Sequence, residues 1–182
     1  MKPISPKSAL KKAHSIQVKA NKLGLKQPVI ADVAEVDHTH LYDILVTDGE
    51  LRDITRELFM GKHYAQAVKD GFQFICDVAR SKSGSDQDGT KLFDSILGGE
   101  NTKIELKTKF RRNDSKNNLR IGYMNMCKGC YMGIRNPRMH EPTIKDDPMV
   151  AVELLCLANH LIIMFRNSKR IRGSKKKKGI TK

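Results

Sequence analysis

The stretch "DDPMVAVELLCLANHLIIMFR", residues 146–166, decides the fold of this 182-residue chain. Either of its two aspartates can cap a helix, and Pro148 suits the first turn because a backbone N–H would be unpaired there in any case. From Met149 to Phe165, apolar residues fall on nearly every side of that helix. Such a helix buries most of its surface, so we expect it at the centre of the fold or in a subunit interface.

The same stretch, followed by lysines and arginines, also has the layout of a membrane anchor with a positively charged flank. It is at the short limit for crossing a bilayer, however, and it contains Glu153, Asn159 and His160. A single charge at the centre of a membrane helix costs about 2.5–3.5 kcal/mol. We therefore expect a buried helix of a soluble protein, without membrane contact.

Helical spacing of apolar residues recurs upstream of this stretch. One helix is expected from Leu51 to Phe59 and a second from Tyr64 to Val78, with Gly61 at the corner between them. A short helix is expected in "TKLFDSIL", where paired glycines follow. These patterns predict an all-α fold, a helical bundle with a polar and basic insertion around residues 99–118 whose architecture the pattern does not determine.

Residues 119–135 show the clearest helical pattern. One face of this helix holds its apolar residues, which are Leu119, Tyr123, Met126, Cys127, Cys130 and Ile134. Pro137 lacks an N–H group and restricts the backbone of the residue before it. We therefore expect the helix to end near Arg135 or Asn136.

The net charge of +14 is concentrated at the two ends of the chain. Residues 1–30 hold seven lysines and no acids, and residues 166–182 hold nine lysines or arginines and no acids, which leaves 31–165 near neutral. We expect a basic N-terminal segment (1–45), a helical domain (46–166) and a disordered Lys/Arg-rich tail (167–182). Cations of the tail are the expected nucleic-acid contacts: Arg170, Arg172, Lys175, Lys176, Lys177 and Lys178.

The four cysteines indicate a reduced, cytoplasmic protein, because they fall within apolar helical segments and the N-terminus lacks the pattern of a signal peptide. The pair "CKGC" at 127–130 resembles half of a zinc site, but zinc needs four ligands and no second pair is present in the sequence. Phosphate-binding glycine motifs are also missing from the sequence. We therefore expect neither a metal nor a cofactor.

The segment "MGIRNPRMHEP", residues 132–142, contains the candidate chemistry. Arg135 is a permanent cation, Asn136 is a polar neighbour, and His140 carries a side chain of the type that titrates near neutrality, a combination that suits phosphodiester chemistry. The same residues also fit a structural role. Arg135 could bond carbonyls at the end of its helix, and His140 could bond a loop carbonyl.

This segment and the following "DDPMVAVELLCLANHLI" resemble the closing part of a HEPN domain of the uncharacterised Ymh type, in which an arginine, a polar residue and a histidine form an R-x4-6-H motif. Arg135, Asn136 and His140 match that motif. Upstream, "LFMGKHYAQAVKDGFQFICDVAR" and "DGTKLFDSIL" are similar to the earlier helices of the family. The resemblance covers roughly residues 51–166.

The resemblance implies a HEPN-like helical bundle that forms a homodimer, with two Arg/His pairs along one cleft. It also implies a metal-independent endoribonuclease of phage-defence (abortive-infection) or toxin–antitoxin systems, with RNA as substrate and an antitoxin or defence-system protein as a further partner. In that family His140 would transfer protons, Arg135 would stabilise phosphoryl charge, and Asn136 would orient the scissile phosphate or the histidine. Tyr131 and Glu141 would support these three residues.

HEPN domains also include inactive members. The alternative function is therefore a non-catalytic nucleic-acid-binding or regulatory partner protein, in which the basic ends contact phosphates and residues 135–140 are structural. A purely structural dimerisation module is a third possibility.

Overall fold

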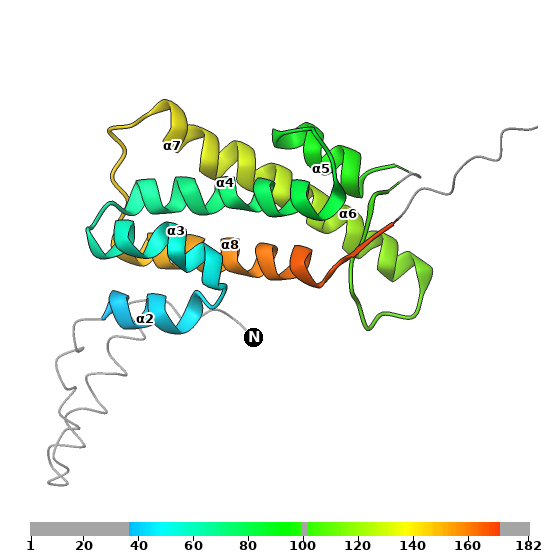
Figure 1. The fold of residues 1–182 in the computed structure, drawn as a ribbon, viewed down its shortest axis with the longest axis horizontal. Coiled ribbons are helices and arrows are strands. Elements are labelled where there is room, and N and C mark those ends of the chain that lie inside the picture. Colours follow the sequence, from blue (N-terminus) through cyan, green and yellow to red (C-terminus); the bar gives the residue numbers. More distant parts are fainter. Residues whose placement is uncertain (1–36, 100–101, 172–182) are drawn as a thin grey trace, which may run out of the picture. The chain divides into compact units, whose positions relative to one another are not determined.

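The computed structural model describes residues 37–99 and 102–171. The all-α class is confirmed, because helices dominate and the described strands form only a two-stranded sheet (Figure 1). The elements are α2 (His38–Leu45), α3 (Gly49–Met60), α4 (Tyr64–Ser83), α5 (Gly89–Leu97), β1 (Ile104–Glu105), α6 (Asn113–Cys130), the π-helical turn η1 (Tyr131–Arg135), α7 (Asn136–His140), α8 (Pro148–Asn167) and β2 (Lys169–Arg170).

The helix expected at the centre of the fold is there as α8. Asp147 caps it, with its Oδ1 accepting a hydrogen bond from the Met149 amide at 2.8 Å, and Pro148 occupies the first turn. One side of α8 is buried against α4 and another against α2. Gly71 of α4 permits the close approach, because a Cβ atom there would lie 2.9 Å from Cδ2 of Leu155.

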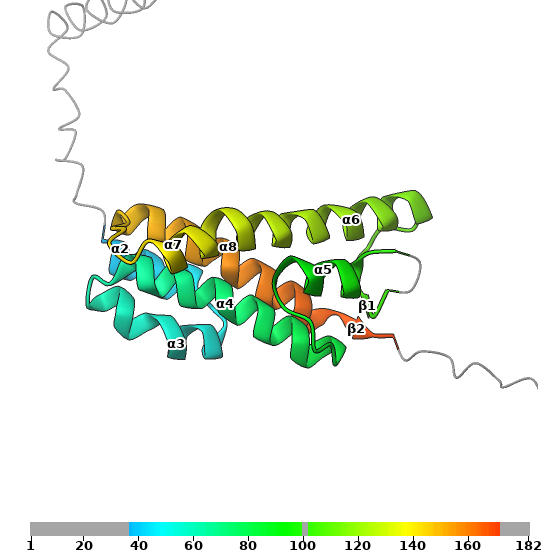
Figure 2. The same ribbon diagram turned by 90° about the horizontal axis from the view of Figure 1, so that it is seen from above.

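Helix α4 connects the parts of the bundle. It packs against α8 and α3, and also against η1, α5 and α7 (Figure 2). The continuous stretch α6–η1–α7 runs along the side of this arrangement, with α6 over α5 and with η1 and α7 on α4. The core between these helices includes Phe72, Phe93 and Phe165, each no more than 2 % exposed.

The structure refines several predicted boundaries. The corner after α3 lies at Gly61 as expected, although the residue with a left-handed backbone is Lys62, at φ 62°. The packed unit begins at His38, before residue 46, since Tyr42 of α2 is fully buried. Within the insertion 99–118, Ile104–Glu105 pairs antiparallel with Lys169–Arg170, and α6 already begins at Asn113.

Helix α8 also meets the length and composition of a membrane span, and it is the one such helix among the described residues. About half of the residues in the apolar stretch of α8 are exposed or half-exposed, while its buried side packs on α4 and α2. A core helix passes the same test, so the expected lack of membrane contact stays a prediction.

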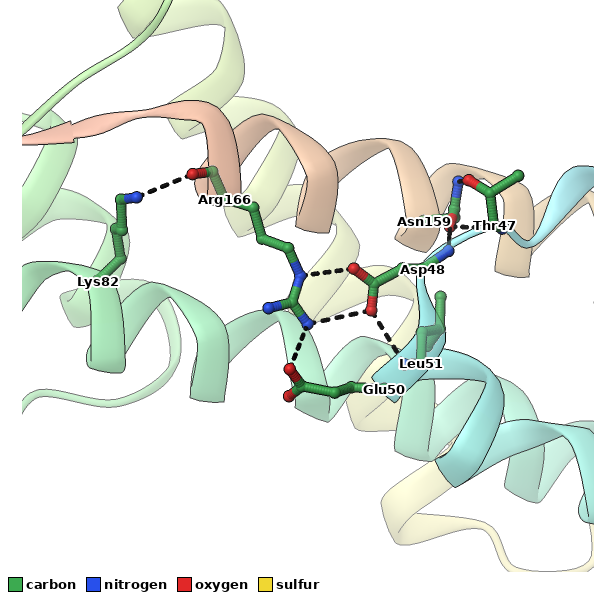
Figure 3. A network of polar contacts seen from close by, with 7 residues as sticks. All are labelled: Thr47, Asp48, Glu50, Leu51, Lys82, Asn159 and Arg166. Carbon is green, nitrogen blue, oxygen red and sulfur yellow. Dashed lines mark hydrogen bonds and ion pairs between the residues drawn. The ribbon is translucent and has the colours of Figure 1, made fainter.

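A polar network joins the α2–α3 corner to α8 (Figure 3). Oδ1 of the buried Asn159 accepts hydrogen bonds from the amides of Thr47 at 3.0 Å and Asp48 at 2.8 Å. The Asp48 carboxylate caps α3 through the Leu51 amide at 3.0 Å and pairs with Arg166 of α8, whose Nε lies 2.5 Å from Oδ2. The network supplies partners for the amides of Thr47 and Asp48 and for the Asp48 carboxylate. A shift of α3 relative to α8 would leave these groups without a partner, so the network sets the relative position of the two helices.

Replacing Asn159 with leucine should therefore lower the free energy of unfolding by about 2–4 kcal/mol, because two backbone donors lose their acceptor. The measurement is urea unfolding followed by circular dichroism. Asn167→Leu, an exposed change at the end of the same helix, serves as the control and should cost less than about 0.5 kcal/mol. Equal stability of the two variants would show that the network does not hold the corner.

Candidate functional site

The expected end of the helix at Arg135 or Asn136 is wrong. The helix passes through Pro137 and ends at His140, so that α6, η1 and α7 form one continuous helical stretch (Figure 2). Met126, which we expected on the apolar face, is 43 % exposed, whereas Cys127 and Cys130 of that face are buried.

The π-helical turn explains how a proline is accommodated. In an α-helix the proline ring clashes with the carbonyl four residues earlier. Here the Asn136 amide bonds the Tyr131 carbonyl, five residues earlier, so the backbone widens directly before Pro137. One-turn π-helical segments of this kind are frequent at functional sites, because they change the direction of the side chains that they carry.

Arg135 is held against α4 by neutral groups. Its Nε donates to Oε1 of Gln73 at 3.1 Å, and an Nη donates to Oδ1 of Asn136 at 3.1 Å. The guanidinium also lies 5.1 Å from the ring centroid of Tyr131, which confirms that Tyr131 and Arg135 share a face. Among the described residues Arg135 forms no ion pair, so its charge is not compensated by a carboxylate of the described chain.

Arg138, three residues later, is in the opposite situation. Its Nε and Nη2 bond the two carboxylate oxygens of Asp146, both at 2.7 Å, and the two side chains are only 11 % and 10 % exposed. A third bond, at 2.9 Å, runs from Arg138 to the Ile134 carbonyl inside the π-helical turn. Arg138 therefore ties the 141–147 connection to η1. The sequence pattern did not single it out, because nothing local distinguishes it from Arg135.

His140 lies apart from the Arg135 group. Five residues of α-helix separate the two positions by about 140° around the axis and about 7.5 Å along it. His140 and Glu141 are exposed, and their side chains make no hydrogen bond or ion pair with the described part of the chain. Within one protomer the structure thus brings Tyr131, Arg135 and Asn136 together, and it does not add His140 or Glu141 to them.

An open cleft of about 520 Å³ lies between the start of α4 and the segment 138–146, and His140 is not part of its lining. Its charged and titratable lining residues are Lys62, His63, Lys69, Arg138, Glu141, Lys145 and Asp146. Asp146 is paired with Arg138, and Lys69 lies 3.3 Å from Asp70. Of the remaining formal charges, Lys62 and Lys145 outnumber Glu141 by one, so the cleft keeps a small positive excess that would attract a phosphate group.

The cysteines pack as apolar side chains. All four are free, and burial raises the pKa of Cys76 to about 12 and also raises the pKa of Cys127 and Cys130 above the ordinary value. A raised thiol pKa disfavours the thiolate, which is the form that binds metals. The described residues contain no group of three or more potential metal ligands.

Of the basic residues expected to contact nucleic acid, Arg170 belongs to β2 and is exposed. Arg172 and Lys175–Lys178 lie outside the described residues.

Comparison with known families gives one match. The model of a family described as "Protein of unknown function (Hypoth_ymh)" matches residues 46–164, more than half of the chain. Neither the curated proteins nor the solved structures yield a match.

The contrast between the two arginines can be tested by stability. Arg138→Met should lower the free energy of unfolding by about 3 kcal/mol, because it leaves the Asp146 carboxylate buried and unpaired. Adding Asp146→Leu should restore most of that loss. Arg135→Ala, whose lost partners are neutral, should cost about 1 kcal/mol or less. Urea unfolding of the wild type and these three variants measures this, and an equal cost for Arg135→Ala and Arg138→Met would show that the two arginines do not differ in how their charges are satisfied.

Proposed function

The chain belongs to the Hypoth_ymh family, and for this member we propose a metal-independent endoribonuclease of the HEPN type that cleaves RNA with Arg135, Asn136 and His140. The observation that carries the proposal is the state of Arg135. It is positioned by Gln73, Asn136 and Tyr131, all of them neutral, so its charge is available to a phosphate. A purely structural arginine would be expected to resemble Arg138, whose charge is satisfied by an aspartate with a side chain only 10 % exposed.

The proposed reaction uses the 2′-hydroxyl of the RNA as nucleophile. His140 removes a proton from this hydroxyl or protonates the departing 5′-oxygen, and its exposed position leaves it accessible to a substrate. Arg135 stabilises the negative charge that grows on the phosphoryl oxygens. The products are a 2′,3′-cyclic phosphate and a free 5′-hydroxyl, and no metal takes part.

A homodimer is part of the proposal, because one protomer does not present Arg135 and His140 together. An exposed face of α6 and η1 supports it. This glycine–methionine face consists of Gly122, Met126, Gly129, Met132 and Gly133. The methionines are 43 % and 55 % exposed, and a Cβ atom at any of the three glycines would meet nothing within 4 Å.

Packing among the described residues does not require the glycines at these three positions. Each costs a helix roughly 0.5–1 kcal/mol relative to alanine. They would allow a second helix to approach closely, and the adjacent methionines would supply adaptable apolar contacts. A second copy of the chain is the occupant that would also bring another Arg135 and another His140 to the same region.

The proposal also includes a biological setting. The three buried thiols with raised pKa fit a reduced, cytoplasmic protein. A role in phage defence or a toxin–antitoxin pair, with an antitoxin or defence-system partner, rests on the family resemblance alone.

Both Arg135→Ala and His140→Ala should abolish RNA cleavage. The assay incubates each purified protein with total RNA and tRNA in excess EDTA and analyses the ends of the products. Loss of at least about a hundredfold in rate is expected, since proton transfer and charge stabilisation each contribute that much. Lys91→Ala, an exposed change on α5 outside the proposed site, is the control and should retain wild-type cleavage.

The outcomes separate the functions. Cleavage that leaves 2′,3′-cyclic phosphate and depends on both residues supports the endoribonuclease. Undiminished cleavage by both variants would show that these residues are not the site. RNA binding without cleavage by the wild type would favour the non-catalytic binding protein instead.

Gly129→Leu should weaken self-association by about tenfold or more, because the added side chain prevents close approach of the two helices. Leucine is a good helix former, so the protomer should stay folded. Sedimentation equilibrium measures the dimer constant, with Gly49→Leu, a helical glycine equally open to solvent, as control. A wild-type protein that is monomeric at high concentration would contradict the dimer, and unchanged association of Gly129→Leu would exclude this face.

A further inference from the structure

The connection between β1 and α6 carries an exposed aromatic side chain among cations. Phe110 is 54 % exposed, and the residues around it in "KTKFRR", 107–112, include Lys107, Lys109, Arg111 and Arg112, all of them exposed. We refer to residues 107–112 as the Phe110 loop. It contains no acidic residue, so its charge is entirely positive.

Tertiary contacts add further cations to this loop. Because β1 pairs with β2, with Glu105 opposite Lys169, the basic residues Lys169 and Arg170 lie beside the strand that leads into the loop. A groove of about 180 Å³ opens next to Phe110, and its lining includes Lys107, Lys116 and Lys169. Glu105 is the one acidic residue of that lining.

Buried residues directly before the Phe110 loop hold its first end in place. Leu106 directly before it is buried, and Ile104 is fully buried. Within the loop the Phe110 amide donates to Oγ1 of Thr108 at 3.1 Å. The anchoring residues fix the start of the loop, and Phe110 nevertheless leaves more than half of its surface in solvent, where that part gains nothing from hydrophobic burial.

We propose that the Phe110 loop, together with Lys116 and Lys169, binds single-stranded RNA. A base would stack on the ring of Phe110, and the surrounding lysines and arginines would contact the phosphates on either side. Exposed aromatic rings within a positively charged groove are the usual means of binding single strands, because every base has a face that can stack. A duplex offers no such face along its length, since its bases are already stacked on one another.

This surface is separate from the proposed cleavage site. Asn113 at the start of α6 and Arg135 are 22 residues apart along one helical stretch, which corresponds to about 33 Å. Figure 2 shows the β1–β2 end of the bundle and α7 at opposite ends of that stretch. The inference rests on the proposed function for the identity of the nucleic acid as RNA, and it assigns a second contact region far from the scissile bond.

The test measures fluorescence anisotropy of the full chain with a labelled single strand of about 12 nucleotides, within the site sizes known for stacking grooves. The strand carries 2′-O-methyl groups, so that it cannot be cleaved through its 2′-oxygens. Phe110→Leu keeps an apolar side chain without an aromatic face and should weaken binding about tenfold. Phe110→Tyr keeps the face and should bind like the wild type.

Charge is tested separately. Arg111→Gln should reduce the slope of log K against log[salt] by about 0.7, the value for one phosphate contact to a single strand. Lys91→Gln, which removes one exposed charge from α5, should leave the slope unchanged. Circular dichroism confirms that each exposed substitution leaves the fold intact.

Equal binding by wild type and Phe110→Leu would overturn the proposal, and so would a Phe110→Leu defect of the same size for poly-glutamate, because either result would show a surface without base stacking. The outcome is independent of cleavage. If the wild type never cleaves RNA while Phe110→Leu loses binding, the nuclease fails and the RNA surface stands. If His140→Ala abolishes cleavage while Phe110→Leu binds normally, the nuclease stands and the RNA-binding surface fails.

Discussion

Helix α8 is apolar on nearly every side, and water must be excluded from its buried residues, which make up just under half of its apolar stretch. The other helices are arranged accordingly: α4 covers one side, α2 another, and α3 and α5 are attached to α4. Since hydrophobic burial has no direction of its own, packing alone would allow α4 and α8 to slide. Gly71 fixes their separation, because Leu155 fills the space that a larger residue would need.

Directional interactions then select one arrangement. Asn159 and Arg166 are the polar residues of α8 that engage the α2–α3 corner, through the amides of Thr47 and Asp48 and the carboxylate of Asp48. Arg138 and Asp146 act in the same way for the connection into α8. Both ion pairs lie at chain reversals that lead into helices, so they help to determine where the chain turns.

The two arginines of the 132–142 segment, Arg135 and Arg138, have different partners although they lie three residues apart. Pro137 requires a widened turn, and that turn places Arg135 against the neutral side chain of Gln73 while Arg138 reaches Asp146. The turn before Pro137 thus leaves Arg138 paired with a carboxylate and Arg135 with neutral partners only. This is the physical basis on which a phosphate-binding role is assigned to Arg135 rather than to Arg138.

The sequence by itself determined the helical class, the central place of 148–167 with its aspartate cap and proline, and the corner at Gly61, because these follow from apolar spacing and local backbone chemistry. It also placed Tyr131 on the face of Arg135. Only the tertiary structure decided that the helix passes Pro137, that Met126 faces outward, and that Arg138 is neutralised by Asp146. It also showed that Lys116 and Lys169 join the basic residues around Phe110. These features depend on which residues distant in sequence become neighbours, and local periodicity carries no information about that.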